Sequence, residues 1–410
     1  MIRDDLVNPA YFVDLVDPVG THSHRDTTVN RTTQSRHAKR SLAAAALLVA
    51  AGCATSTTSS PSRAPSPSPS TAPSTTEGGT TPPVQTTWPV RTREHVDLWL
   101  HAYALLTPDS NLVPYFRRGY RDQIVAVRRQ RGISTLLDAS RPKLLERINV
   151  NPSLATGPQF LPFYFASWDQ MRETVNLFLQ RNGNPRGSDQ TTQQYFAILS
   201  GAFQTAPDRE WLRQFVAAVE DESRRFYHDY WVSESRTHAA TVARVDSVWQ
   251  QQWRPAFQRY LNNTQQQNGE VYLSLPLDGE GRTVHLGKVQ NAVAVEMPDS
   301  PQNAEMALYV FAHEIAGSVA STAVEDITTP AERRAGATSR YDQSAAVRAG
   351  ALLLEKTMPS AVPGYMRFYL QSAGRAAPTD PKAAFTTTFA LPDAITDAIA
   401  RQLDVILGGI

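Results

Sequence analysis

The 410-residue chain has a single cysteine, Cys53, and it lacks both a strong net charge and the common short catalytic motifs. One thiol cannot form an internal disulfide, so the folded part must be stable without covalent cross-links. A formal net charge of +1 gives no global attraction to nucleic acid, and no basic patch is interleaved with aromatic residues. The absence of GxSxG, GxGxxG, P-loop and CxxC patterns removes support for serine-hydrolase, nucleotide-binding and redox functions.

The residues that lead up to Cys53 have the pattern of an export signal. A basic stretch at 36–40 precedes the apolar run SLAAAALLVAAG, which ends directly before Cys53. The run is shorter than the roughly 20 residues that a transmembrane helix needs. The sequence VAAGC resembles a bacterial lipobox, with Ala50 where leucine is commonest. This resemblance implies that Cys53 carries a lipid and anchors the protein in the membrane of a bacterial cell envelope, facing the periplasm or the exterior. The alternative is an ordinary secretory signal with an incidental cysteine.

Composition divides the chain into segments. Residues 1–35 are an extended n-region or precede the true translation start, and 36–53 form the lipoprotein signal peptide. Residues 54–87 consist almost wholly of Ser, Thr, Pro, Gly and Ala. Because such a stretch cannot bury enough apolar surface to offset its ordering entropy, we expect a disordered tether. We expect a helical domain at 88–265 and an α+β domain at 266–410.

Apolar spacing in the folded part predicts an α+β protein that is mostly α-helical. Two strand-like runs, EVYLSLPL and RTVHLGKV, flank the turn Asp278-Gly279-Glu280-Gly281 and predict a hairpin, with NAVAVEMP (Asn291–Pro298) as a third strand. The expected sheet is therefore small, antiparallel and of about three strands. It precedes a buried helix that contains FAHEIAGSVA. Further helices are expected at about 93–106, 115–131, 136–149, 167–182, 190–204, 207–229, 236–263, 342–357, 362–373 and 391–406.

The stretch FAHEIAGSVA places His313 and Glu314 side by side on this apolar helix. A strand-then-helix order with His-Glu resembles the zincin metallopeptidases of the gluzincin type, over about residues 269–357. In their HExxH motif, two histidines one helical turn apart bind zinc and the glutamate acts as the general base. The resemblance implies His313 as a zinc ligand and Glu314 as the base, but Gly317 occupies the position of the second histidine. The motif is therefore degenerate.

Other residues are candidates to complete or to replace such a site. Glu355 on the following helix is the candidate for a further zinc ligand, Glu325 is a second, and His285 is a candidate replacement for the missing histidine. Alternatively, Arg348 pairs with the buried His313–Glu314 and the network is structural. A helix that contains His-Glu by chance is the third interpretation.

These observations lead to three functional hypotheses. The first is a membrane-anchored lipoprotein with a non-catalytic zincin-like body that binds peptides along strand 291–298 or serves as an envelope scaffold. The second is an active zinc metallopeptidase with an atypical ligand set. The third is a purely structural, helical envelope lipoprotein. We expect no cofactor unless the protein is active, in which case zinc is expected. The expected partners are the membrane, through Cys53, and a peptide or envelope protein, but no nucleic acid.

Overall fold

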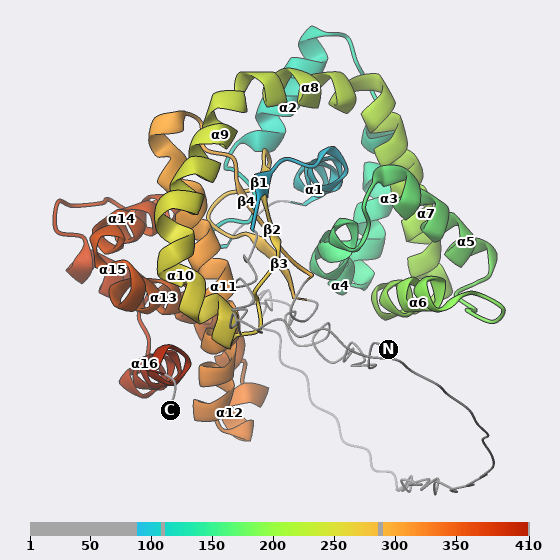
Figure 1. Ribbon diagram of the computed structural model, residues 1–410. Coiled ribbons are helices and arrows are strands. Elements are labelled where there is room, and N and C mark those ends of the chain that lie inside the picture. The colour runs from blue at the N-terminus through green and yellow to red at the C-terminus, as the bar shows by residue number, and fades with distance from the viewer. Residues whose placement is uncertain (1–87, 108–110, 286–289, 409–410) are drawn as a thin grey trace, which may run out of the picture. The chain divides into compact units, whose positions relative to one another are not determined.

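The computed structural model of the protein describes residues 88–107, 111–285 and 290–408. The predictions for the n-region, the signal peptide, Cys53 and the tether lie outside these residues. The α-helices are α1 (Glu94–Leu106), α2 (Tyr120–Gln130), α3 (Leu136–Val150), α4 (Ser153–Thr156), α5 (Trp168–Gln180), α6 (Gln190–Ala202), α7 (Ala206–Glu222), α8 (His228–Thr237), α9 (Ala239–Val248), α10 (Arg254–Asn263), α11 (Ala304–Ile327), α12 (Pro330–Arg334), α13 (Ala337–Thr357), α14 (Val362–Ser372), α15 (Lys382–Thr388) and α16 (Asp393–Gly408). The strands are β1 (Val90–Arg91), β2 (Glu270–Ser274), β3 (Arg282–His285) and β4 (Asn291–Glu296). The mostly helical α+β class is confirmed (Figure 1).

The sheet differs from the prediction in its topology. It has four strands in the order β1-β2-β4-β3, and it is mixed rather than antiparallel. Strands β1 and β4 both run parallel to β2, whereas β3 runs antiparallel to β4. The expected hairpin between the runs on either side of Asp278–Gly281 is wrong, because β4 lies between β2 and β3. All six residues of β4 are buried, as expected for a central strand that is covered on both faces.

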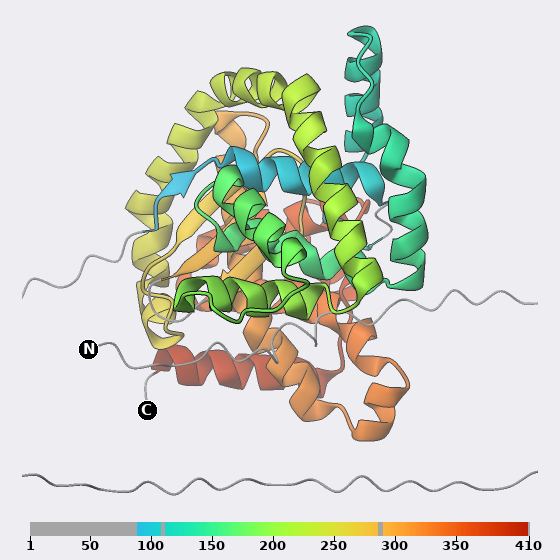
Figure 2. The ribbon, with the colours of Figure 1, turned by 90° about the vertical axis from the view of Figure 1, so that its right-hand side faces the viewer.

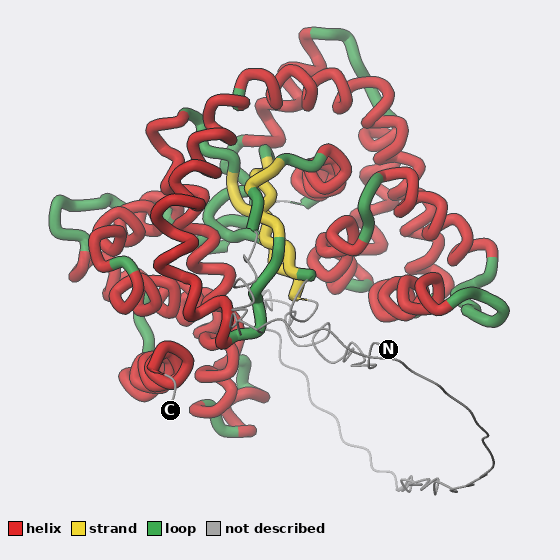
Figure 3. The backbone as a smooth tube through the Cα atoms, in the orientation of Figure 1, coloured by secondary structure: helices red, strands yellow, loops and turns green. Residues whose placement is uncertain are grey.

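Helices surround the strands (Figure 2 and Figure 3). Among these helices, α11 contacts both β3 and β4. Its length and apolar composition would suit a membrane span, but 72% of its most apolar window is buried inside the protein. Phe311 packs against Trp88, with ring centroids 5.4 Å apart, and against Trp249, at 4.6 Å. Burial of these aromatic rings stabilises the packing of α11 against the chain that leads into β1.

Chain segments from both sides of position 265 pack against α11. Helix α9 contacts α11 and β1, and α13 and α16 also contact α11. Residues 85–410 cluster as one compact unit. The texture of the sequence does change near residue 265, from helices to strands, but packing continues across that position. Whether 88–265 and 266–410 fold independently stays a prediction.

Several local signals for helix ends are confirmed. The Ser167 hydroxyl accepts a hydrogen bond from the Gln170 N–H at 3.2 Å and caps α5. Gly183 follows α5 with a φ of 80°, in the left-handed region that glycine adopts readily. Helix α7 begins at Ala206, one residue before the expected start, and Thr205 and Asp208 cap it reciprocally. The N-cap of α11 is Asn303, without a side-chain bond.

Candidate functional site

Three side chains that can bind a metal ion come together beside the middle of α11. Glu280 lies in the loop between β2 and β3, and His313 and Glu314 lie on α11. Their ligand atoms are all within 4.8 Å of one another. The His313 Nε2 atom is 3.0 Å from Glu280 Oε2 and 3.6 Å from Glu314 Oε1. The side chain of His313 is 2% exposed, that of Glu280 12% and that of Glu314 11%, so the cluster is almost fully desolvated.

The loop that carries Glu280 is fixed by contacts with two glycines. The Tyr369 hydroxyl donates to the Gly279 carbonyl at 3.0 Å. A Cβ at Gly281 would lie 2.6 Å from both the Ala294 carbonyl oxygen and the Glu314 Cγ atom. A side chain at position 281 would therefore push α11 away from β3 and β4, so the close approach requires glycine.

The carboxylate of Glu314 is bound to the start of the edge strand β3. Its Oε1 atom accepts a hydrogen bond from the Gly281 N–H at 2.9 Å, and its Oε2 atom accepts one from the Thr283 hydroxyl at 2.6 Å. Both oxygens are thus engaged with the segment that leads into β3. Charge-assisted bonds of this kind are stronger than neutral ones, so Glu314 holds the strand and the helix together.

Glu280 is held on its other side by α13. The Gln343 side-chain amide donates to Glu280 Oε1 at 3.1 Å and to the Val113 carbonyl at 2.8 Å, and its oxygen accepts from the Val113 N–H at 3.2 Å. Each carboxylate oxygen of the cluster therefore has a protein partner, and these partners fix the orientation of the carboxylates.

Burial and the two carboxylates shift the pKa of His313 in opposite directions. Burial alone lowers the pKa of His313, but the charge and hydrogen bond of Glu280 more than offset it, and the pKa is raised. The Ala346 carbonyl on α13 also raises it, although the buried Nδ1 atom has no hydrogen-bond partner of good geometry among the described residues. Burial raises the pKa of Glu314, His313 lowers it and the nearby Glu280 charge raises it, with a net rise.

The structure brings His313 and Glu314 together but places the other predicted residues elsewhere. Arg348 is not their partner as expected: Glu280 takes that place, and the charge next to Arg348 is that of Glu355. Glu355 is exposed on α13, because Gly350, five residues earlier, is the position that faces His313. Five residues turn a helix by about 140° relative to the starting face. Glu325 and His285 are also exposed.

The residues expected from the zincin resemblance therefore do not fit a zinc ion. Gly317 has no donor atom, and an exposed Glu355 cannot join a buried His313. Only His313 remains from that set, and a single protein ligand does not hold zinc. The residue that the sequence reasoning missed is Glu280. Its signal was the sequence Gly279-Glu280-Gly281, an acidic residue between two glycines in a short loop before a strand, which we interpreted only as a turn.

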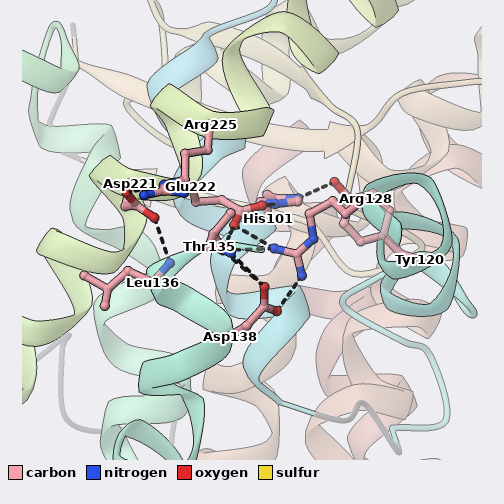
Figure 4. A network of polar contacts seen from close by, with 9 residues as sticks. All are labelled: His101, Tyr120, Arg128, Thr135, Leu136, Asp138, Asp221, Glu222 and Arg225. Carbon is pink, nitrogen blue, oxygen red and sulfur yellow. Dashed lines mark hydrogen bonds and ion pairs between the residues drawn. The ribbon is translucent and has the colours of Figure 1, made fainter. Parts of the chain in front are cut away.

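A second buried network joins α1, α2, α3 and α7 (Figure 4). Glu222 Oε2 accepts from Arg128 Nη1 at 2.7 Å and from the Thr135 hydroxyl at 2.5 Å, while Glu222 Oε1 is 3.1 Å from His101 Nε2. Arg128 also pairs with Asp138, at 2.7 Å. Burial lowers the pKa of His101. Burial would raise the pKa of Glu222, but the hydrogen bond from His101 and the nearby positive charges lower it overall. Each charged group here has a partner of opposite sign.

Two further carboxyl groups are buried near the ends of β2 and β4. Burial raises the pKa of Asp97 to about 7, against hydrogen bonds from the Trp231 indole and the Leu275 N–H. Burial raises the pKa of Glu296 to about 8, and the nearby charge of Arg117 only partly opposes this. Both groups are therefore protonated in the folded protein through much of the range below neutral pH.

Comparison with known proteins gives no relatives. No family model, curated protein or solved structure matches this chain.

Proposed function

We propose that the protein is an exported lipoprotein of a bacterial cell envelope, anchored by a lipid on Cys53, whose folded body is a non-catalytic, zincin-like scaffold. The observation that carries this proposal is the engagement of Glu314. Both of its carboxylate oxygens accept hydrogen bonds from Gly281 and Thr283. A general base takes its proton from a water molecule bound in an accessible cleft, whereas the Glu314 side chain is only 11% exposed. Here the residue in that position holds an edge strand instead.

The strand pairing in the sheet favours a scaffold function over the binding of a peptide along residues 291–298. Strand β4 is paired on both sides, with β2 and with β3. An added peptide strand needs an unpaired edge, which β4 does not offer. The edge strand next to α11 is β3, and the Glu314 side chain occupies the approach from that helix. These contacts favour a closed body over an open cleft.

A peptidase assay tests the absence of catalysis. The complete chain, purified in detergent, is incubated with a mixed-sequence peptide library, with and without added Zn²⁺, and products are followed by mass spectrometry. We expect no zinc-dependent cleavage. Cleavage that is lost in a folded Glu314→Gln variant, but kept in Glu325→Gln, would establish the metallopeptidase and overturn the scaffold proposal.

A fractionation experiment tests the anchor separately. In a bacterial host, the wild-type chain should be recovered with membranes, and Cys53→Ser should move to the soluble fraction because it cannot be acylated. Mass spectrometry of the wild-type N-terminus should find lipid on Cys53. Unchanged membrane association of Cys53→Ser, together with an unmodified wild-type cysteine, contradicts the lipoprotein proposal.

A further inference from the structure

We propose that Glu280, His313 and Glu314 form a binding site for one divalent metal ion of the Zn²⁺ or Mn²⁺ type, in which Glu314 is a ligand rather than a base. The site differs from the set that the zincin resemblance implies, because Glu280 from the loop before β3 replaces the ligands expected from the helices. The proposal goes beyond the scaffold function: the metal would fasten the loop of Glu280 to α11 without adding catalysis.

The separations of the ligand atoms fit a tetrahedral ion. Zinc binds nitrogen and oxygen ligands at about 2.1 Å, so two ligands at a tetrahedral angle lie about 3.4 Å apart. His313 Nε2 is 3.0 Å from Glu280 Oε2 and 3.6 Å from Glu314 Oε1, on either side of that value. The oxygens of the two carboxylates lie within 4.8 Å of each other, so a small rotation of these side chains would bring all three atoms around one ion. One imidazole with two carboxylates suits Zn²⁺ or Mn²⁺ better than the softer Cu⁺.

The three ligands are oriented by protein groups that leave coordination possible. Gln343 donates to the Glu280 oxygen that does not face His313. Thr283 donates to the Glu314 oxygen that does not face His313. The Gly281 N–H donates to the Glu314 oxygen that does face His313, but a carboxylate oxygen has a second lone pair. Supporting contacts of this kind set the direction of metal ligands and increase affinity.

The charges of the cluster also favour a cation. Two carboxylates share one imidazole in a nearly desolvated place, so these three side chains alone carry an excess of one negative charge even when His313 is protonated. Arg282 is the nearby cation; its charge also acts on Glu314, and its guanidinium donates to Gln159 and to the Gly281 carbonyl. Among the residues that the structure describes, no other three such side chains converge in this way. A divalent ion would reverse the excess and relieve the repulsion between the carboxylates.

Gly317 provides an approach to the cluster. It lies one helical turn after His313, on the same face of α11, and an added Cβ would have no atom within 4 Å. The space beside this position is open, while the atoms on the other side of His313 are close: the Gly350 Cβ position is 3.2 Å from the His313 Cα atom. We therefore place the entry of the ion on the side of Gly317.

Isothermal titration calorimetry tests the proposal on the complete chain carrying Cys53→Ser, which removes the one thiol that would compete for zinc. The protein carries no histidine tag, is purified in detergent and is stripped with a chelator before Zn²⁺ or Mn²⁺ is added alone. We expect one equivalent to bind and the melting temperature to rise, because a ligand that binds only the folded state stabilises it. Electron paramagnetic resonance of bound Mn²⁺ provides an independent count.

The variants separate this site from incidental binding. Glu280→Gln and Glu314→Gln keep the side-chain shape, and each should weaken binding at least tenfold, as should His313→Ala. Glu355→Gln and Glu325→Gln should bind as the parent does. Absence of binding by the parent, or equal binding by a folded Glu280→Gln, overturns the site. If the parent binds metal and also cleaves peptides, the scaffold function fails while the metal site stands, so the two failures are distinguishable.

Discussion

The two buried polar networks of this protein differ in how their charges balance. Around Glu222, one carboxylate meets Arg128 and His101, and the second carboxylate of the network, Asp138, pairs with the same arginine. Around His313, two carboxylates share one imidazole. The pKa of Glu222 is lowered, since positive groups and hydrogen bonds outweigh burial, whereas the pKa of Glu314 is raised by burial and by the neighbouring Glu280. In the first network each carboxylate has a cationic partner, whereas the second brings two carboxylates to one imidazole.

The largest expected effect of a single substitution lies in the balanced network. Glu222→Ala removes the anion that Arg128 and His101 share, and it leaves a buried guanidinium without its main partner. Losing one partner of a buried pair costs about 3–5 kcal/mol of the free energy of unfolding. Chemical denaturation measures the loss. Glu220→Gln on the same helix is the control, because Glu220 is half-buried and its pair with Arg172 contributes at most about 1 kcal/mol. A loss no larger than that of the control contradicts a structural role for Glu222.

The matching change in the unbalanced network has a smaller expected effect on stability. In chelator-treated protein, Glu280→Gln should change the free energy of unfolding by less than about 1 kcal/mol, since it removes repulsion along with a hydrogen bond. Metal should stabilise the parent and not this variant. A loss as large as that of Glu222→Ala would show that the two networks are alike and that Glu280 is a simple structural partner of His313.

Asp97 and Glu296 are two further buried carboxyl groups, and no neighbouring cation fully offsets the effect of burial on their pKa. Their contribution to folding stability therefore depends on pH. The folded pKa values of Asp97 and Glu296, about 7 and about 8, lie above their values of 3.8 and 4.5 in a solvated chain. Folding therefore binds protons, so the stability from these groups is present at low pH and lost as the pH rises from about 4 to 8. Each group contributes up to about 1.4 kcal/mol per pH unit within its own window.

The double variant Asp97→Asn, Glu296→Gln isolates this contribution. Relative to the wild type, it should gain about 2–3 kcal/mol between pH 5 and pH 6, where both groups are within their windows, measured by denaturation at each pH. His95 and His101 act in the opposite sense below their solvated pKa of 6.5, because burial lowers both pKa values. They are present in both proteins and cancel in the difference. Parallel pH profiles of the two proteins would contradict the protonated state of Asp97 and Glu296.

The sequence predicted the helices well and the sheet poorly, for a physical reason. Helices such as α5 follow from local spacing and from caps such as Ser167. The sheet depends on contacts distant in sequence: β1 at Val90 pairs with Val271, and β4 inserts between β2 and β3. No local pattern encodes that order. Burial of β4, which its continuous apolar run does indicate, was the available clue to a central strand.

The candidate site shows the same limit. His313 and Glu314 are neighbours in sequence, and their burial followed from the apolar helix around them. Glu280 joins them from 33 positions away, through a loop that two glycines allow to approach α11. Whether Arg348 or Glu355 faces His313 depends on the rotation of α13 about its own axis. Residue spacing alone did not determine that rotation. Residues brought together by packing between elements were therefore the ones that sequence reasoning missed.

A gain of metal affinity at Gly317 would sharpen the contrast between the networks. Gly317→His places a second imidazole one turn after His313, in space that holds no atom within 4 Å of the new Cβ. We expect zinc affinity to rise about tenfold or more, which is about 1.4 kcal/mol. Titration calorimetry measures it, with Gly317→Gln as the control for size. Unchanged affinity in a folded Gly317→His variant would show that the open space does not lead to the ligands.

The smallest expected effect concerns the same position without a ligand atom. Glycine within a helix costs up to about 1 kcal/mol relative to alanine, because the unfolded chain loses more conformational freedom. At Gly317 no neighbour opposes a methyl group, whereas at Gly350 the Tyr365 hydroxyl would lie 2.2 Å from the new Cβ. Gly317→Ala should therefore stabilise the protein by up to about 1 kcal/mol, and Gly350→Ala should destabilise it, as measured by denaturation. A destabilised Gly317→Ala would mean that the side chain meets an obstacle there, and the approach to His313 from that side would be closed.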